Sequence, residues 1–356
     1  SMKKVDYIVV GFGIAGICMA ERLQARGKSF RLIDNAQEGA TAASGGVLNP
    51  TVLKRFTAAW NAASFFKTAI PFYKSLGERI GVPMLKDVAI HRILHSVEEQ
   101  NNWMVASDKK ELESFISSEI LTNKNTSVAA PLGLGNVKGG ALMHPEKLIN
   151  TFRNFLKASN ILISENFEHD LLKISGNHVE YKDVSAKHII FCEGASVVDN
   201  PFFPLSVSPH RDKVFVGNKG EYVIFKAPKL KLNSILKGPM MIIPLGNDLY
   251  KVGASYGRDD FSKGTTKDAR EEIVSKLKRM ISCDFEVVDQ VSGIRPTVKD
   301  RKPLLGKPFE NKPIYFMNGL GTRGLSMAPL LSEWLLDSIA AGKPLPAEVN
   351  INRFLK

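Results

Sequence analysis

The sequence predicts a mixed α/β protein built from two units, one of them organised around a buried sheet. Two observations carry this prediction. The first 34 residues follow the pattern strand, glycine turn, helix, strand, which is typical of a βαβ unit. Residues 220–256 instead hold several short strand patterns separated by proline and glycine, which indicates a β-rich layer. At 356 residues and 44% hydrophobic content, the chain is long enough for two packed units.

Composition and charge narrow the class of protein. No apolar run reaches the roughly 18 residues of a membrane span, and no charged-then-apolar leader is found, so a cytoplasmic protein is expected. Cys18, Cys192 and Cys283 are odd in number and lack CxxC spacing. They are interpreted as packing residues, and neither a disulfide framework nor a metal site is expected. The formal charge of +12 fits a nucleic acid or an acidic substrate, but a solvated surface is the preferred interpretation of its scattered lysines.

The clearest motif lies near the N-terminus. An apolar strand over residues 5–10 leads into GFGIAG. In this motif Gly11 allows a tight turn, Gly13 lets a pyrophosphate approach the backbone, and Gly16 lets helix and strand pack closely. A helix over about residues 14–26 and a second strand over 29–33 follow, and Asp34 ends that strand where a carboxylate can bind both ribose hydroxyls. These features predict a dinucleotide site in a Rossmann-like unit, and the charge of Asp34 disfavours NADP.

The segment after Asp34 separates the two remaining dinucleotides, NAD and FAD. A nicotinamide enzyme is expected to continue with further βαβ units, whereas residues 38–50, EGATAASGGVLNP, form a small-residue loop with no strand pattern. In this loop Ala43, Ser44 and Gly45 let backbone N–H groups come close to a flat polar ring or a pyrophosphate. The loop therefore favours FAD, and a flexible surface loop is the alternative interpretation.

Three later segments extend the pattern over nearly the whole chain. AKHIIFCEGAS, at residues 186–196, is a strand that runs into a turn at Gly194. SGIRPTVKDRKPLLG, at 292–306, places an arginine before a proline, and GLGTRGLSMAP, at 319–329, is a glycine turn before the last helix. In this order the motifs resemble the D-amino acid oxidase family of FAD enzymes, which includes glycine and sarcosine oxidases. The resemblance implies FAD as the cofactor and a small amine or amino acid as the substrate.

The resemblance also implies roles for individual residues. Arg295 is expected to form a two-pronged contact with a substrate carboxylate, a task suited to a guanidinium fork. Tyr256 is expected on the substrate-facing strand, and Arg323 is expected to reach the same pocket or the flavin rim. A helix N-terminus and its backbone donors are expected at the pyrimidine end of the flavin, with Pro329 early in that helix. The residues of this turn are Gly321, Gly324, Leu325 and Ser326.

The implied reaction removes hydride from the carbon next to an amine nitrogen, delivers it to flavin N5, and leaves an imine that is hydrolysed. No acid–base residue need be essential when the amine arrives unprotonated. The histidines are therefore interpreted as surface or core residues rather than catalysts; those considered are His91, His95, His144 and His210. Non-covalent binding of FAD is expected, because no cysteine stands in or just before the terminal glycine turn, where covalently flavinylated relatives carry one.

The same resemblance implies interleaved units instead of consecutive domains. An FAD-binding unit is expected to take residues 1–80, 140–205 and 290–356, and a substrate-binding unit to take 81–139 and 206–289. Within the second unit, KDAREEIVSKLKRMI is typical of an amphipathic helix, with apolar positions at Ile273, Leu277, Met280 and Ile281.

Other motifs are similar to the oxidase domain of the bifunctional enzyme that trims carboxymethylaminomethyl uridine in tRNA. They are R-G-L-x-x-A-P-L-x-x-E from Arg323 to Glu333, D-R-x-P from Asp300 to Pro303, and G-x-L-x-P from Gly46 to Pro50. That reaction also oxidises a C–N bond, so the alternative is a tRNA-modifying oxidoreductase whose basic residues meet RNA phosphates. The small-molecule reading is preferred because the basic residues are dispersed and the richest cluster lacks stacking aromatics. That cluster is Lys226, Lys229, Lys231 and Lys237.

Overall fold

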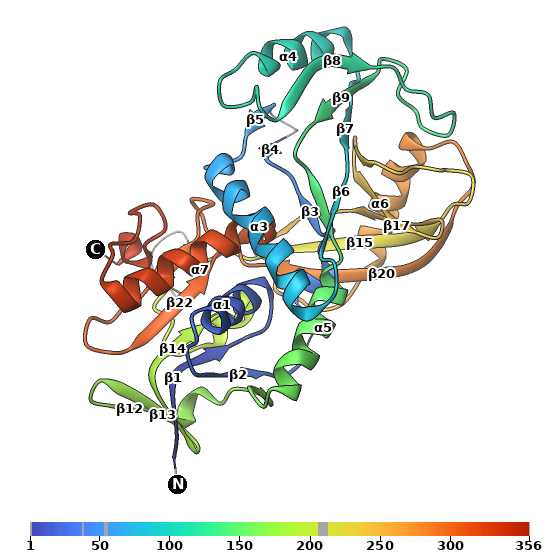
Figure 1. Ribbon diagram of the computed structural model, residues 1–356. Coiled ribbons are helices and arrows are strands. Elements are labelled where there is room, and N and C mark those ends of the chain that lie inside the picture. Colours follow the sequence, from blue (N-terminus) through green and yellow to red (C-terminus); the bar gives the residue numbers. More distant parts are fainter. Residues whose placement is uncertain (1, 38, 53–55, 206–212, 356) are drawn as a thin grey trace.

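The computed structural model describes residues 2–37, 39–52, 56–205 and 213–355, which form two large sheets with helices packed on them (Figure 1). Glu38, at the start of the small-residue loop, and His210 lie outside the described residues. The mixed α/β class predicted from the sequence is confirmed.

The first sheet has eight strands and forms around β1, the strand before the glycine turn. Its order is β11-β2-β1-β14-β13-β12, with β22 beside β14 and β21 beside β22. Their bounds are β1 (Lys3–Val10), β2 (Phe30–Asp34), β11 (Leu162–Ser164), β12 (Leu172–Ser175), β13 (His178–Tyr181), β14 (Val184–Phe191), β21 (Leu304–Gly306) and β22 (Ile314–Asn318). Parallel pairing of β1 with β2 and β14 explains its apolar run, because Val9 faces one hydrophobic cluster and Ile8 the other.

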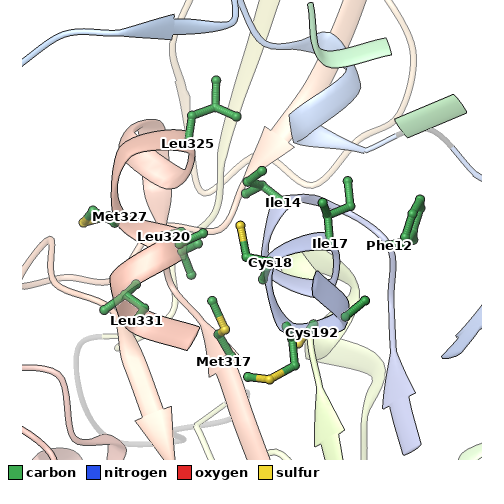
Figure 2. Packing of buried hydrophobic residues seen from close by; sticks show 14 of the residues in the cluster. Phe12, Ile14, Ile17, Cys18, Cys192, Met317, Leu320, Leu325, Met327 and Leu331 are labelled. Carbon is green, nitrogen blue, oxygen red and sulfur yellow. The ribbon is translucent and has the colours of Figure 1, made fainter. Parts of the chain in front are cut away.

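Helices cover one face of this sheet and bury the cluster that contains Val9. They are α1 (Ile14–Ala25), α3 (Ala62–Ile80), α5 (Pro145–Ala158) and α7 (Gly324–Ala341). Figure 2 shows Ile14 and Cys18 of α1 pointing toward Leu320 and the first turns of α7. Burial at this interface raises the pKa of the Cys18 thiol to about 12, which agrees with its interpretation as a packing residue.

The second sheet has nine strands, in the order β19-β15-β18-β17-β16-β7-β9-β8, and β20 pairs with the other edge of β15. Their bounds are β7 (Ile90–Ile93), β8 (Ile116–Leu121), β9 (Leu134–Val137), β15 (Asn218–Lys226), β16 (Ile235–Lys237), β17 (Met241–Gly246), β18 (Leu249–Gly253), β19 (Gly257–Arg258) and β20 (Glu286–Arg295). The predicted amphipathic helix is α6 (Lys267–Met280), which buries Ile273 and Leu277 against one face; α4 (Val97–Ser107) packs near β8 (Figure 1).

One local prediction is wrong. The sequence predicts no strand over residues 38–50, but the chain forms the short helix α2 (Ala40–Ala43) and the strand β3 (Val47–Leu48). The reason is a distant partner, because β3 pairs with β10 (Ala141–Met143), which in turn pairs with β6 (Leu85–Asp87). A second small ribbon follows from β4 (Thr51–Val52) and β5 (Thr57–Ala58). Pairing with a strand far along the sequence leaves no local pattern to detect.

The division into two interleaved units remains a prediction. Strands of the eight-stranded sheet fall within residues 3–34, 162–191 and 304–318, and those of the nine-stranded sheet within 90–137, 218–258 and 286–295. The strand β20 therefore crosses the expected boundary at residue 290. Among the residues that the structure describes, no helix is both long and apolar enough to cross a lipid bilayer.

Candidate active site

The glycine turn after β1 forms a backbone cradle at the carboxyl edge of the eight-stranded sheet. Gly11 has a φ of +105°, and a side chain there would collide with the carbonyl of Cys192 at the end of β14. Gly13 caps α1 without any side-chain bond, and the Ile14 N–H donates to Thr41 Oγ1 at 2.9 Å. A helix N-terminus opening from a glycine turn at this edge is suited to a pyrophosphate.

Asp34, at the end of β2, has a partner that sequence analysis missed. Arg153 of α5 places Nη2 2.9 Å from Asp34 Oδ2, and the same oxygen accepts the Ala36 N–H at 2.9 Å. The Arg153 guanidinium also lies 5.4 Å from the ring centre of Phe12, inside the glycine turn. Within the described residues both bonds end on Oδ2, so Oδ1 is available to a ribose hydroxyl. Because Arg153 offsets the charge of Asp34, this carboxylate repels a 2′-phosphate less than an unpaired one would.

The terminal glycine turn brings a second helix N-terminus to the same region. A 3₁₀ turn (Gly321–Arg323) leads directly into α7, whose first residue Gly324 lies against Ile14 of α1. Among the residues that the structure describes, no side chain caps α7, so its first N–H groups remain available to a ligand oxygen. The Leu325 and Ser326 residues named from the resemblance occupy this first turn.

The expected place of Pro329 is wrong. It is the sixth residue of α7, beyond the positions where a missing N–H has no consequence. A proline here removes the bond that would end on the carbonyl four residues earlier, which belongs to Leu325. Tyr73 of α3 supplies the missing donor, since its hydroxyl lies 2.5 Å from that carbonyl.

Arg295 ends β20 and is nine-tenths buried, with 9% of its surface exposed. Its guanidinium lies over Gly220 of β15, where a side chain would collide with it. Within the described part of the chain, Nη1 is buried without a hydrogen-bond partner; Nη2 makes a 3.4 Å contact with the Ser255 carbonyl, and the guanidinium also interacts with the Tyr222 side chain. The ring of Tyr256, 70% exposed, lies 4.7 Å from the guanidinium. A buried cation with an unused donor is costly, so the arrangement is suited to an anionic ligand.

The small-residue loop is held against the second sheet near Arg295. Lys251 of β18 donates to the Ser44 carbonyl at 2.7 Å and lies 5.2 Å from the ring centre of Tyr222. A side chain on Gly45 would collide with Ile243 and approach Tyr222, while Ala43 lies against Gly293 of β20. Burial raises the pKa of Tyr222, and the positive charge of Arg295 opposes that rise. Tyr222 and Lys251 lie in predicted strands, but their sequence positions did not reveal this contact.

Other named residues have structural partners. Arg323 donates to the carbonyls of Asn49 at 2.6 Å and Thr51 at 2.8 Å, and burial lowers its pKa. Its contact with substrate or flavin therefore stays a prediction. Gly194 has a φ of +59°, and its carbonyl accepts from Asn318 Nδ2 at 3.0 Å. Gly321 donates to the Pro296 carbonyl at 2.9 Å, which links the terminal turn to the residue after Arg295.

Comparison with known proteins identifies the family of this chain. The family described as "FAD dependent oxidoreductase" matches residues 6–338. The chain belongs to this family. Its cofactor is FAD, and the cradle formed by the glycine turn, Asp34 and the N-termini of α1 and α7 fits a dinucleotide of this kind.

Named relatives and structures agree with the family. The chain is 24% identical to a glycine oxidase of Bacillus licheniformis, with 97% of this chain and 95% of that protein covered. It is 26% identical to the tRNA 5-methylaminomethyl-2-thiouridine biosynthesis bifunctional protein MnmC of Idiomarina loihiensis, with 92% of this chain but only 54% of that protein covered. The chain thus spans about half the length of this relative.

Among solved structures, the fold is similar to that of a glycine oxidase from Geobacillus kaustophilus, with a TM-score of 0.77, 18% identity, and 98% and 97% of the two chains covered. An iminodiacetate oxidase from Chelativorans sp. BNC1 gives a TM-score of 0.74 at 18% identity, with 98% of each chain covered. The FAD-dependent oxidoreductase predicted from the sequence, with its Rossmann-like arrangement, is confirmed.

Proposed function

We propose that this protein oxidises the C–N bond of an amino acid or an N-substituted glycine. The observation that carries the proposal is the buried Arg295, whose Nη1 has no hydrogen-bond partner among the described residues. A carboxylate bound there gains a charge-assisted hydrogen bond and satisfies that donor. Because α-amino acids carry the amine one carbon from the carboxylate, fixing the carboxylate also fixes the carbon to be oxidised.

The residues of the chain have distinct tasks in this scheme. Arg295 binds the carboxylate, and Tyr256 lies over its guanidinium on the solvent side, where it reduces the access of water. The bound FAD supplies the hydride acceptor. The uncapped N-terminus of α7 offers N–H groups and a positive dipole end to negative charge that develops during the reaction. The imine product is then hydrolysed by water.

The relatives support this substrate class. A glycine oxidase and an iminodiacetate oxidase resemble the chain over nearly its whole length. Glycine and iminodiacetate share an amine nitrogen one carbon from a carboxylate. The carboxylate contact assigned to Arg295 is therefore suited to both.

The test is anaerobic bleaching of the flavin by candidate amines. We expect absorbance loss with at least one of glycine, sarcosine, iminodiacetate, D-amino acids or proline, and no loss with the corresponding amines that lack a carboxylate. A flavin that dithionite reduces but none of these carboxylates reduces would contradict the proposal.

A second candidate is oxidation of carboxymethylaminomethyl uridine in tRNA. It is supported by the likeness to the MnmC protein and by the formal charge of +12. This candidate uses the same bond chemistry on a larger substrate. Bleaching by modified tRNA, with no bleaching by free amino acids, would favour it over the first.

A further inference from the structure

We propose that the substrate carries a nucleotide phosphate and that this phosphate binds in a basic hollow beside the carboxylate site. The hollow is lined by Lys213, Arg258 and Lys299, together with Val216 and Asp259, and has a volume of about 430 Å³. The inference rests on the proposed function, because it extends the ligand bound at Arg295.

Three neighbouring extended segments build the hollow. Arg258 belongs to β19, which pairs with the start of β15, and the Asp259 N–H donates to the Gly217 carbonyl at 3.0 Å. On the opposite side, the Lys299 N–H donates to the Val214 carbonyl at 2.8 Å. The segment containing Lys213 therefore lies between the segments of Arg258 and Lys299. Their backbones are fixed by hydrogen bonds, so the three cationic side chains remain close together.

The charges in the hollow do not cancel. Lys213 Nζ lies 2.9 Å from Asp259 Oδ2, so this one carboxylate offsets one cation. Lys299 packs 5.7 Å from the ring centre of Phe354, and within the described residues neither Lys299 nor Arg258 has a carboxylate within ion-pair distance. All three cationic residues are exposed, which leaves their donors open to a solvated anion. The excess of positive charge is suited to phosphate oxygens.

The position of the hollow connects it with the proposed carboxylate site. Asn218 of β15 pairs with Arg258 on one edge and with Arg295 on the other. Two strand spacings therefore separate the backbones of Arg258 and Arg295, a distance of about 10 Å. Tyr256 lies two residues before Arg258 in the chain, with its ring over Arg295 and 70% of its surface exposed.

These three features match one kind of ligand. A guanidinium binds a carboxylate, an exposed aromatic ring stacks on a base, and a basic hollow binds a phosphate. A nucleotide that bears a carboxylated amine on its base has all three groups. The fold thus gathers cations that are far apart in the sequence and places an exposed aromatic side chain near them, as RNA recognition requires.

The experiment compares two triple variants with equal loss of charge. The first, Lys213→Gln/Arg258→Gln/Lys299→Gln, neutralises the hollow. The control, Lys226→Gln/Lys229→Gln/Lys231→Gln, neutralises the basic cluster at the opposite end of β15, roughly 27 Å from Asn218. All six side chains belong to exposed residues, and both variants are expected to keep the flavin content and melting temperature of the wild type.

Binding is measured with UMP, with uridine and with a fluorescein-labelled oligouridine over a series of salt concentrations. We expect the hollow variant to lose at least about tenfold in affinity for UMP and oligouridine, and the control to lose less than about threefold. Binding of uridine, which has no phosphate, is expected to be equal in all three proteins. If the slope of log affinity against log salt concentration for oligouridine falls by about 0.7 for each phosphate contact that the hollow variant loses, the phosphate belongs to an RNA strand. If only the binding of UMP is weakened, the phosphate belongs to a free nucleotide.

Equal weakening of both variants, or no weakening of the hollow variant, would overturn the phosphate site. Flavin bleaching by glycine-class amines is measured on the same proteins and is expected to be unchanged in both variants. Failure of these amines to bleach the flavin of the wild type would refute the proposed function. The binding comparison would still test whether the hollow binds phosphate.

Discussion

The hydroxyl of Tyr73 donates a 2.5 Å hydrogen bond to the carbonyl of Leu325, which Pro329 leaves without its helical partner. Arg22 of α1 also contacts this part of α7, because its Nη2 donates to the Pro329 carbonyl at 2.9 Å. The first turns of α7 are therefore fixed from α3 and from α1. These turns carry the donors expected to face the flavin.

Tyr73→Phe is expected to destabilise the protein by about 1–3 kcal/mol, because it leaves a buried carbonyl unsatisfied. Urea unfolding measures the loss. The matched background is Pro329→Ala, which restores an N–H donor within the helix. In that background the same Tyr73→Phe change is expected to cost less, and an equal cost in both backgrounds would show that Tyr73 does not replace the missing helical bond.

Arg295→Ala is expected to weaken capture of a carboxylate substrate by about 2–5 kcal/mol, which is roughly two orders of magnitude or more. Flavin content is expected to stay near normal. Rapid-reaction bleaching at varied substrate concentration measures the effect, and Arg295→Lys is expected to recover only part of it because an ammonium lacks the guanidinium fork. Undiminished turnover of a carboxylate substrate by Arg295→Ala would assign the residue another role.

Arg153→Ala is expected to weaken FAD binding by about tenfold, or about 1.4 kcal/mol, because the variant removes the ion pair that orients Asp34. Titration of the apoprotein with FAD and with FMN measures this. FMN has no adenosine ribose, so its affinity is expected to be unchanged.

The matched control for this ion pair is Arg79→Ala. Arg79 pairs with Glu21 and packs on Phe155, on the same helical layer but away from Asp34. A similar loss of FAD affinity in Arg79→Ala, or an equal loss of FMN affinity in Arg153→Ala, would indicate a general structural effect.

Acid destabilisation is expected to depend in part on His188. This residue of β14 lies between Tyr7 and Tyr315, and burial lowers its pKa below the usual value of 6.5 for histidine. The unfolded chain therefore binds more protons than the folded chain as the pH falls through 6.5, so this contribution to stability is lost in that range. His188→Phe is expected to flatten the dependence of urea midpoint on pH between about 7 and 5. An unchanged pH profile would rule out this contribution.

FAD is expected to be bound without a covalent link. Cys192 is buried, and its burial raises the pKa of the thiol, so it lacks thiolate character. Denaturation by heat or acid is expected to release the yellow colour into the supernatant. Colour that remains with the precipitated protein would contradict the prediction.

The elements of the fold that were predicted correctly are those whose pattern lies within one short stretch of the sequence. Residues 3–34 carry an apolar run, a glycine turn, a helix pattern and a second strand in sequence, and the structure forms β1, α1 and β2 there. The contacts of Arg153 with Asp34 and of Lys251 with Ser44 join positions more than a hundred residues apart. No single-sequence pattern encodes such contacts, because they depend on how distant helices, loops and strands pack together. The same reason explains why residues as far apart in sequence as Lys213, Arg258 and Lys299 show no clustering in the sequence.

The pairing of β1 has a consequence for how the chain folds during synthesis. Its neighbour β14 is translated about 180 residues later, and β22 beside β14 is completed only at Asn318. Such high contact order slows folding: one edge of β1 stays open on the ribosome until β14 emerges, and the edge of β14 that pairs with β22 stays open until nearly the whole chain has emerged. The nascent protein is therefore expected to depend on chaperones, and slower translation before residue 184 would lengthen its exposure to aggregation.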